Sequence, residues 1–355
     1  MNWFQQHYDT AFNWVFAGVT QPLLFSFGLM NYWDEAYLGT ETVLLGALEI
    51  TLLALIVVPL EKWRPFEAQQ DAAAVRTDFA YTLINRLGLL PLFLFTITLP
   101  VEGAIDGWLH EQGIARITLD TLLPVLMSHP LVAFFSYLVL FDFLGYWIHR
   151  GQHRFGWWWQ LHAVHHSQRA MSVWTESRNH YLDDVLVALL LVLAARLAGT
   201  PATQFVWLVF ASRVIESLSH ANWRSGYGAL FSRVIVDPHF HRIHHAIGLG
   251  HEGPARGLNF AVLLPLWDGL FGTARFGRTD AATGIRDQLD GRDYGRGLIA
   301  QQWIGLKGLV RAVLRSAPVP AYAASFPAAS FPAASFPVSS SSTASLPAAS
   351  SRPNS

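Results

Sequence analysis

Cysteine is absent from all 355 residues of the chain. This absence excludes disulfides, thiolate zinc sites, cysteine-ligated iron–sulfur clusters and a cysteine nucleophile. Any metal must therefore be held by imidazole, carboxylate or amide groups. Imidazole is a ligand that suits iron, zinc, copper and nickel.

Charge is also scarce, because only 14% of the residues are charged, against roughly 25% in a typical soluble domain. Lys and Arg number 24, Asp and Glu number 25, and the net charge is −1. No overall field favours nucleic acid, and no basic patch is interleaved with aromatics, so nucleic acid is excluded as a partner. The composition is instead 52% hydrophobic, with 14 Trp, a residue that favours membrane–water interfaces.

Several familiar motifs are missing as well. Residues 1–40 contain no Lys or Arg, so the positively charged start of a signal peptide is lacking, and membrane insertion would depend on internal spans. HExxH, GxSxG and Walker A motifs do not occur. A GxGxxG match at 248–253 does not lie between a strand and a helix, and we interpret it as a loop.

Long apolar runs dominate the first two thirds of the chain, and a helical membrane span needs about 20 such residues. The predicted spans are 42–60, 79–101, 130–148, and a hairpin of 182–197 and 205–218. Residues 11–31 are apolar but interrupted, so an in-plane or re-entrant helix fits them as well as a span does.

The positions of Lys and Arg predict the orientation of these spans. Positive residues concentrate in 62–78, 149–180 and 219–315, which places these connections in the cytoplasm. The predicted fold class is an all-α integral membrane bundle of four to six membrane helices with a cytoplasmic, histidine-rich helical cap.

The predicted regions along the chain differ in composition. Residues 1–78 form an N-terminal membrane region, 79–280 form a region that carries 14 of the 15 histidines, and 281–315 form a C-terminal cytoplasmic segment. In residues 316–355 the pentapeptide AASFP recurs and a Ser-rich run follows. This low-complexity segment has too little apolar content to offset its ordering entropy, and we expect it to be disordered.

Histidine is the most informative residue, because 12 of the 15 lie between positions 149 and 251. An HxxxH pair at 149–153 is followed by HxxHH groups at 162–166 and 241–245. Residues three and four apart share one face of a helix, so each group presents its imidazoles in one direction. His180 and His220 stand alone at the two ends of the apolar hairpin, which would bring both to the same rim.

Eight to ten imidazoles exceed what one metal ion takes, since zinc usually has four ligands. The count therefore predicts two metal ions, each with an open position. Ligating imidazoles usually donate their other N–H to a carboxylate or carbonyl. The candidate carboxylates are Asp142, Glu176, Asp183, Asp184, Glu216 and Asp237. Glu216, one helical turn before His220, could instead be a direct ligand.

Taken together, these motifs resemble those of the fatty acid hydroxylase/sterol desaturase superfamily. The resemblance covers roughly 80–280 and includes His220 followed two residues on by Asn222. It also includes the stretch from Asn259 to WDGLFGT at 267–273. His180, preceded by Arg178, is similar to a histidine of an R-x-H-P-x-E element in that family, although Tyr181 and Asp183 replace its Pro and Glu.

The resemblance implies a membrane-bound enzyme with a di-iron centre that uses O2 as co-substrate to hydroxylate or desaturate a lipid. The implied metal ligands are His149, His153, His162, His165, His166, His180, His220, His241, His244 and His245. No fused cytochrome b5-like domain is visible, so electrons are expected from a separate donor of cytochrome b5, ferredoxin or reductase type. The implied location is multi-pass in a membrane with the site on the cytoplasmic face. That membrane would be the plasma or inner membrane in a bacterium and the endoplasmic reticulum in a eukaryote.

Three other functions remain open at the level of sequence. A desaturase would use the same centre and differ only in the step after hydrogen removal. A zinc-dependent membrane hydrolase or lyase would use fewer histidines and a carboxylate base, and would work without oxygen. A transporter or metal-storage role is the third, and a transporter should place its polar ligands near the middle of the membrane, whereas these lie at the ends of spans.

Overall fold

The computed structural model describes residues 3–68, 70–114, 118–252 and 256–314. Over these residues the chain is helical and contains no strand, only an isolated bridge between Ala246 and Thr283. The predicted all-α class is therefore confirmed. The predicted disordered tail, 316–355, lies outside the described residues.

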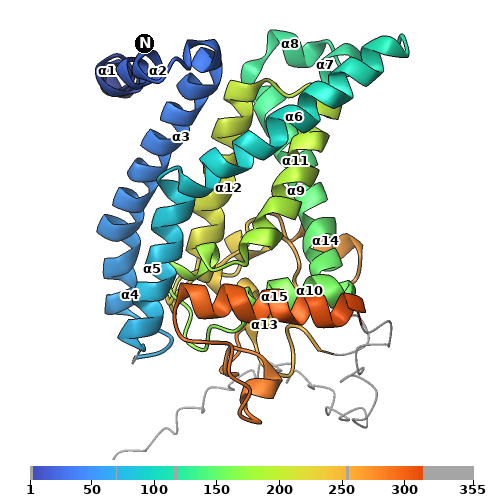
Figure 1. The fold of residues 1–355 in the computed structure, drawn as a ribbon. Coiled ribbons are helices and arrows are strands. Elements are labelled where there is room, and N and C mark those ends of the chain that lie inside the picture. The colour runs from blue at the N-terminus through green and yellow to red at the C-terminus, as the bar shows by residue number, and fades with distance from the viewer. Residues whose placement is uncertain (1–2, 69, 115–117, 253–255, 315–355) are drawn as a thin grey trace, which may run out of the picture. The chain divides into compact units, whose positions relative to one another are not determined.

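Two helical runs form the N-terminal part. The first consists of α1 (Trp3–Val15), η1 (Phe16–Thr20) and α2 (Gln21–Ser26). The second, a long column, consists of η2 (Met30–Tyr32), α3 (Trp33–Leu52), η3 (Leu53–Val57) and α4 (Val58–Trp63). In Figure 1, α1 and α2 lie across the end of α3 that is farthest from α4. Phe16 fixes this corner, because its ring packs edge-on against Trp33 at 4.8 Å and Tyr37 at 5.3 Å between centroids.

The remaining long helices run beside this column (Figure 1). They are α5 (Ala72–Arg86), α6 (Leu89–Glu111), α9 (Pro130–Arg154), α11 (Tyr181–Ala198) and α12 (Ala202–His220), with the short α7 (Leu119–Leu122) and α8 (Val125–Ser128) between them. The predicted span 79–101 is interrupted. Gly88 has a φ of 90° and separates α5 from α6, a backbone conformation that glycine adopts without strain.

The histidine-bearing end of the bundle is built from shorter elements. They are α10 (Gly156–His166), η4 (Thr175–Ser177), η5 (Phe231–Arg233), α13 (Pro238–His245), α14 (Leu266–Leu270), η6 (Arg286–Gln288) and α15 (Leu298–Leu314). In Figure 1, α15 crosses the lower ends of the long helices. It packs closely there because Gly305 is buried, and a Cβ at that position would lie 2.4 Å from Cδ2 of His180.

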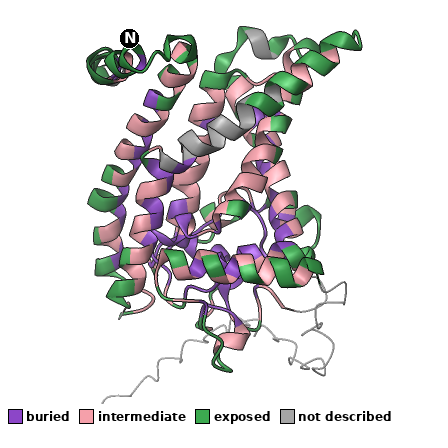
Figure 2. Cartoon of the chain, in the orientation of Figure 1, coloured by how far each residue is buried: buried purple, intermediate pink, exposed green. Residues whose placement is uncertain are grey.

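By length and composition, two described helices could cross a membrane. They are Met30–Trp63, of 34 residues, and Pro130–Arg154, of 25 residues. Only 28% and 17% of their most apolar windows are buried, so most of this apolar surface faces outward. Figure 2 shows the buried residues concentrated instead at the end that holds α10 and α13. The interior of that end is largely polar, which is the reverse of an ordinary soluble core.

Candidate metal centre

Nine buried histidines converge in two groups between the ends of the long helices. The five-histidine group consists of His149, His153, His162, His166 and His244. The four-histidine group consists of His165, His220, His241 and His245. Within each group, one nitrogen from every ring lies within 4.8 Å of all the others. These are nine of the ten predicted ligands, and they come from four different helices.

The histidines of each HxxHH motif are divided between the two groups. On α10, His162 and His166 are four residues apart and share the five-histidine group, whereas His165 points to the other. On α13 the division is reversed, because His241 and His245 form the four-apart pair and His244 joins the five-histidine group. Each motif therefore contributes to both groups, and their separation is held by the short helices themselves.

The Nδ1 atoms of four rings are held by hydrogen bonds. His149 donates to the carbonyl of Phe260 at 2.8 Å, and His244 donates to that of Leu258 at 2.7 Å. The remaining two donors are His162, to Asp183 at 3.2 Å, and His220, to the carbonyl of Glu216 at 2.7 Å. A neutral ring that donates through Nδ1 carries a lone pair on Nε2. These bonds therefore orient four metal-binding lone pairs.

In the four-histidine group the Nε2 atoms themselves are in contact. His220 Nε2 lies 3.1 Å from that of His165 and 2.9 Å from that of His241. His241 Nε2 is 3.1 Å from His245 Nε2. Ligand nitrogens about 2.1 Å from a metal and at right angles to each other would be about 3.0 Å apart. The spacing of these nitrogens therefore fits a shared metal ion.

Several ring nitrogens of the five-histidine group are buried without a hydrogen-bond partner among the described residues. They include Nε2 of His149, His162 and His244 and both ring nitrogens of His153 and His166. A buried polar atom left unpaired costs about 1–3 kcal/mol. Five such rings in one place are explained if a metal ion completes their coordination, so the donor set fits a metal here too.

The pKa values of these rings are consistent with metal binding. Burial, followed by the neighbouring imidazoles, lowers the pKa of His165, His166 and His244 well below the usual 6.5. The same causes lower the pKa of His241 and His245. At neutral pH all five rings are therefore uncharged, which is the form that ligates metals.

His180 does not join either group. It is the N-cap of α11, where its Nδ1 accepts from the backbone N–H of Leu182 at 3.2 Å. Its Nε2 donates to the carbonyl of Gln302 on α15 at 2.8 Å. Since both ring nitrogens are used, the structure gives His180 a helix-capping role in place of the predicted ligand role.

Of the candidate carboxylates, only some contact the clustered histidines. Asp183 holds His162 and also accepts from Trp158 Nε1 at 2.6 Å and Gln152 Nε2 at 2.9 Å. Glu216 contacts His220 through its backbone carbonyl rather than its carboxylate. Three further candidates bind elsewhere: Asp142 to backbone N–H groups at 263–264, Glu176 to Arg86, and Asp237 to the N-terminus of α13.

The loop at 258–261 supplies two of the imidazole acceptors, and sequence reasoning did not find this role. Asn259 adopts a φ of 56°, and its side chain bonds to the backbone of Phe240 and Arg275. The Asp268 carboxylate accepts from the N–H groups of Phe260 and Ala261 at 2.9 and 2.7 Å. Asn259 and the WDGLFGT stretch form a recognisable sequence motif, but their effect on His149 and His244 depends on the fold.

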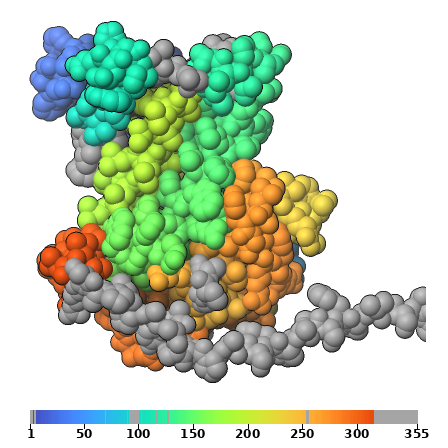
Figure 3. Space-filling view, turned by 90° about the vertical axis from the view of Figure 1, so that its right-hand side faces the viewer, coloured from blue at the N-terminus to red at the C-terminus, as the bar shows by residue number. Residues whose placement is uncertain are grey.

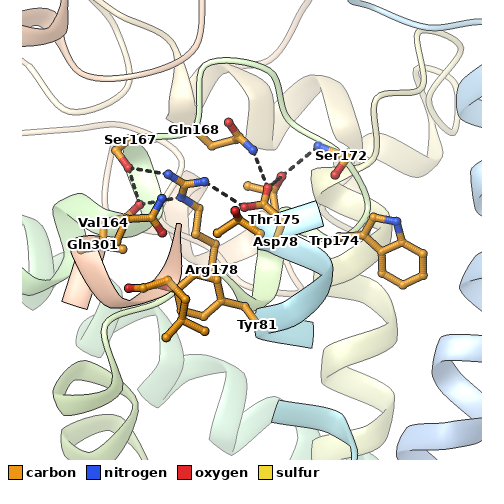
Figure 4. Close-up of polar contacts among 12 residues, drawn as sticks. Asp78, Tyr81, Val164, Ser167, Gln168, Ser172, Trp174, Thr175, Arg178 and Gln301 are labelled. Carbon is orange, nitrogen blue, oxygen red and sulfur yellow. Dashed lines mark hydrogen bonds and ion pairs between the residues drawn. The ribbon is translucent and has the colours of Figure 1, made fainter. Parts of the chain in front are cut away.

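A buried ion pair anchors α10 (Figure 4). Arg178 bonds to the Asp78 carboxylate at 2.9 Å, to Ser167 Oγ at 3.2 Å and to the carbonyl of Val164 at 3.2 Å. Asp78 also accepts from Thr175 at 3.0 Å. Val164 lies between the histidines of the first HxxHH group, so this network fixes the end of their helix to α5.

Comparison with known proteins also points to this part of the chain as the functional site. Residues 134–273 match the family model for fatty acid hydroxylase. They include every histidine of both groups, the loop 258–261, and Asp268, whose carboxylate binds that loop. This part of the chain is therefore similar to the fatty acid hydroxylase family.

Individual relatives of this fatty acid hydroxylase domain differ in their named activities. An ornithine lipid hydroxylase of Rhizobium tropici is 32% identical over 61% of this chain and 63% of its own length. A candidate methylsterol monooxygenase of Dictyostelium discoideum is 27% identical over 72% and 89%. An alkylglycerol monooxygenase of Caenorhabditis elegans is 27% identical over 39% and 26%. The chain thus spans less than two thirds of the first of these relatives, and no solved structure matches it significantly.

Proposed function

We propose that this chain is a membrane-bound di-iron oxygenase that hydroxylates a C–H bond of a lipid with O2. The observation that carries the proposal is the convergence of nine buried imidazoles in two adjacent groups. The relatives named as a lipid hydroxylase and an alkylglycerol monooxygenase support the reaction type and the substrate class. Iron fits both an all-imidazole donor set and oxygen chemistry, and it is the metal that the family resemblance implies.

The five-histidine group would hold one iron and the four-histidine group the other. Two iron ions held side by side supply the redox chemistry that activates dioxygen for insertion into a C–H bond. The protein orients the ligands through the bonds of His149, His162, His220 and His244 described above. It buries all nine rings, which would limit the access of water to the metals.

We propose a multi-pass membrane topology with the metal centre at the cytoplasmic end. The outward apolar faces of Met30–Trp63 and of α9 support this, and α11 and α12 would complete a bundle of four to six membrane helices. The cap would consist mainly of α10, α13 and α15. Residues 1–78 would form the N-terminal membrane region, 79–280 the catalytic region and 281–315 a cytoplasmic segment, with 316–355 as a disordered tail.

Electrons would come from a separate donor of cytochrome b5, ferredoxin or reductase type. The sequence contains no cysteine, so it offers no thiolate ligands for an iron–sulfur cluster of its own. Each hydroxylation of a C–H bond by O2 consumes two electrons and two protons and releases one water. This stoichiometry requires a reductant that is supplied from outside the chain.

Product analysis with labelled oxygen tests the proposal. Iron-loaded protein in nanodiscs would be given a reductant, heavy-isotope oxygen and a lipid extract. The expected product is a lipid that has gained one labelled oxygen atom. A lipid that has lost two hydrogens without gaining oxygen would assign a desaturase instead. Turnover that continues without oxygen would contradict both and favour a hydrolytic site.

A further inference from the structure

An exposed apolar surface lies beside the metal centre. It is formed by Leu230, Phe231 and Val234 around η5 and by Leu266 and Leu270 on α14, and we name it the apolar lip. These five side chains are between 51% and 74% exposed. The two segments adjoin, because the N–H of Val236 donates to the carbonyl of Leu263 at 2.8 Å, and Figure 3 shows them side by side in yellow and orange. Contiguous exposed apolar surface marks a place where something binds.

The position of α14 against α9 indicates what binds to the apolar lip. On α9, Phe135 and Val139 are 58% and 42% exposed, and they belong to the outward apolar face of a helix long enough to cross a membrane. Phe143 and Trp147 continue the same stripe at four-residue spacing. The α14 segment packs on this continuation, with Trp267 5.0 Å from Phe143 and Phe271 4.9 Å from Trp147 between centroids.

Asp142 shows how deep this contact lies. It is buried at the midpoint of α9, eight residues before Arg150, which corresponds to roughly 12 Å along the helix. Its carboxylate accepts from the N–H groups of Leu263 and Leu264 at 2.8 and 3.1 Å and from Trp267 Nε1 at 2.8 Å. Non-helical backbone is tolerated at membrane depth only where the protein satisfies its polar groups, and Asp142 does this here.

We propose that the apolar lip is inserted into the acyl chains of the leaflet that borders the metal centre. Leu266 and Leu270 would then extend the lipid-facing surface at the lower end of α9, where Trp147 is itself 43% exposed. Arg233, exposed beside the lip with its guanidinium 5.0 Å from the ring of Phe276, would lie at the lipid headgroups. The inference rests on the membrane topology of the proposed function, and it revises the prediction that all of 219–315 lies in the cytoplasm.

The inserted segment is continuous with the support of the metal centre. Three residues before Leu263, the carbonyl of Phe260 holds His149, and that of Leu258 holds His244. The five-histidine group therefore lies next to lipid rather than next to the aqueous surface. A lipid substrate would reach it laterally from the leaflet.

The absence of cysteine makes a direct measurement possible. Leu270→Cys and Phe231→Cys would each carry one nitroxide spin label in iron-loaded protein in nanodiscs. Collisions of the label with oxygen, which concentrates in lipid, and with a water-soluble nickel complex would be compared. Phe135→Cys on the outward face of α9 serves as the lipid control, and Asp293→Cys, at an exposed position after η6, serves as the aqueous control.

Labels at Leu270 and Phe231 should match the lipid control, with collision rates with nickel several-fold below those at Asp293. Collision with nickel at the aqueous level would overturn the inference. So would shielding from both reagents, which would indicate that a protein partner or a second copy covers the lip. If the Phe135 label itself behaves as aqueous, the proposed topology fails, and that result is distinct from failure at the lip alone.

Discussion

At the residue scale, the site depends on which ring belongs to which group. Neighbouring histidines in the HxxHH motifs serve different groups: His165 the four-histidine group and His166 the five-histidine group. Sequence spacing predicted that these residues gather, because residues three and four apart share a helical face. It could not predict their division, which depends on how α10 and α13 face each other across the centre.

The adjacent pair His165 and His166 gives a matched test of this division. His165→Ala should remove the metal of the four-histidine group, and His166→Ala that of the five-histidine group, because each change deletes one buried ligand. Each variant should retain about one of two irons, with different Mössbauer signals for the iron that remains. Loss of the same signal in both variants would contradict the assignment of the two groups.

The two isolated histidines form a second matched pair. His180→Ser should keep both metals, since Ser can still cap α11, and the lost bond to Gln302 should cost only about 0.5–1.5 kcal/mol of stability. His220→Ser should lose the metal of the four-histidine group. Metal analysis of the purified variants decides this, and loss of metal from His180→Ser would restore His180 as a ligand.

At the element scale, the loop 258–261 positions the five-histidine group. Its contacts with α9 and α13 span 111 and 14 residues of sequence, and no local pattern encodes such distances. The same limit applied to the predicted span 79–101, where apolar content concealed the break at Gly88. Helix type and approximate ends were predictable from local composition, whereas backbone acceptors and breaks were set by tertiary packing.

Removal of the Asp268 carboxylate, which binds the loop 258–261, should lower the affinity for one of the two metals. Asp268→Ala leaves the N–H groups of Phe260 and Ala261 without their acceptor, so the carbonyl that orients His149 should shift. Loss of such a supporting contact typically lowers metal affinity about 10–100-fold. Titration with a chelator should show a lower iron affinity only in the five-histidine group. An equal fall in the iron affinity of both groups would indicate general unfolding instead.

At the scale of the whole molecule, the polar end of the bundle is stabilised differently from the apolar helices. Nine imidazoles replace an apolar core there, and burial followed by mutual proximity lowers the pKa values of His165, His166 and His241 well below the usual 6.5. The Asp78–Arg178 network fixes this end to α5. Composition predicted a membrane bundle with a histidine-rich end, but the contact of α14 with the middle of α9 appears only in the folded chain.

This arrangement predicts a characteristic dependence of stability on pH. The pKa of His166 and its neighbours is lowered in the folded state, so below pH 6.5 the unfolded chain binds more protons and folding stability falls. Each such histidine contributes a loss of up to about 1.4 kcal/mol per pH unit. The melting temperature of metal-free protein should therefore fall steeply as the pH drops from 6.5 and stay nearly flat above about pH 7.5.

The control is iron-loaded protein, whose melting temperature should fall less until protons displace the metal. A melting temperature of the metal-free form that does not change on acidification would contradict the buried, neutral state of these rings.

The central claim is that the nine histidines hold two iron ions. The most direct measurement is the iron content of protein purified gently with iron-57, together with its Mössbauer spectrum. The account predicts close to two irons per chain with magnetically coupled high-spin signals. One tightly held zinc, or no iron under gentle handling, would contradict it.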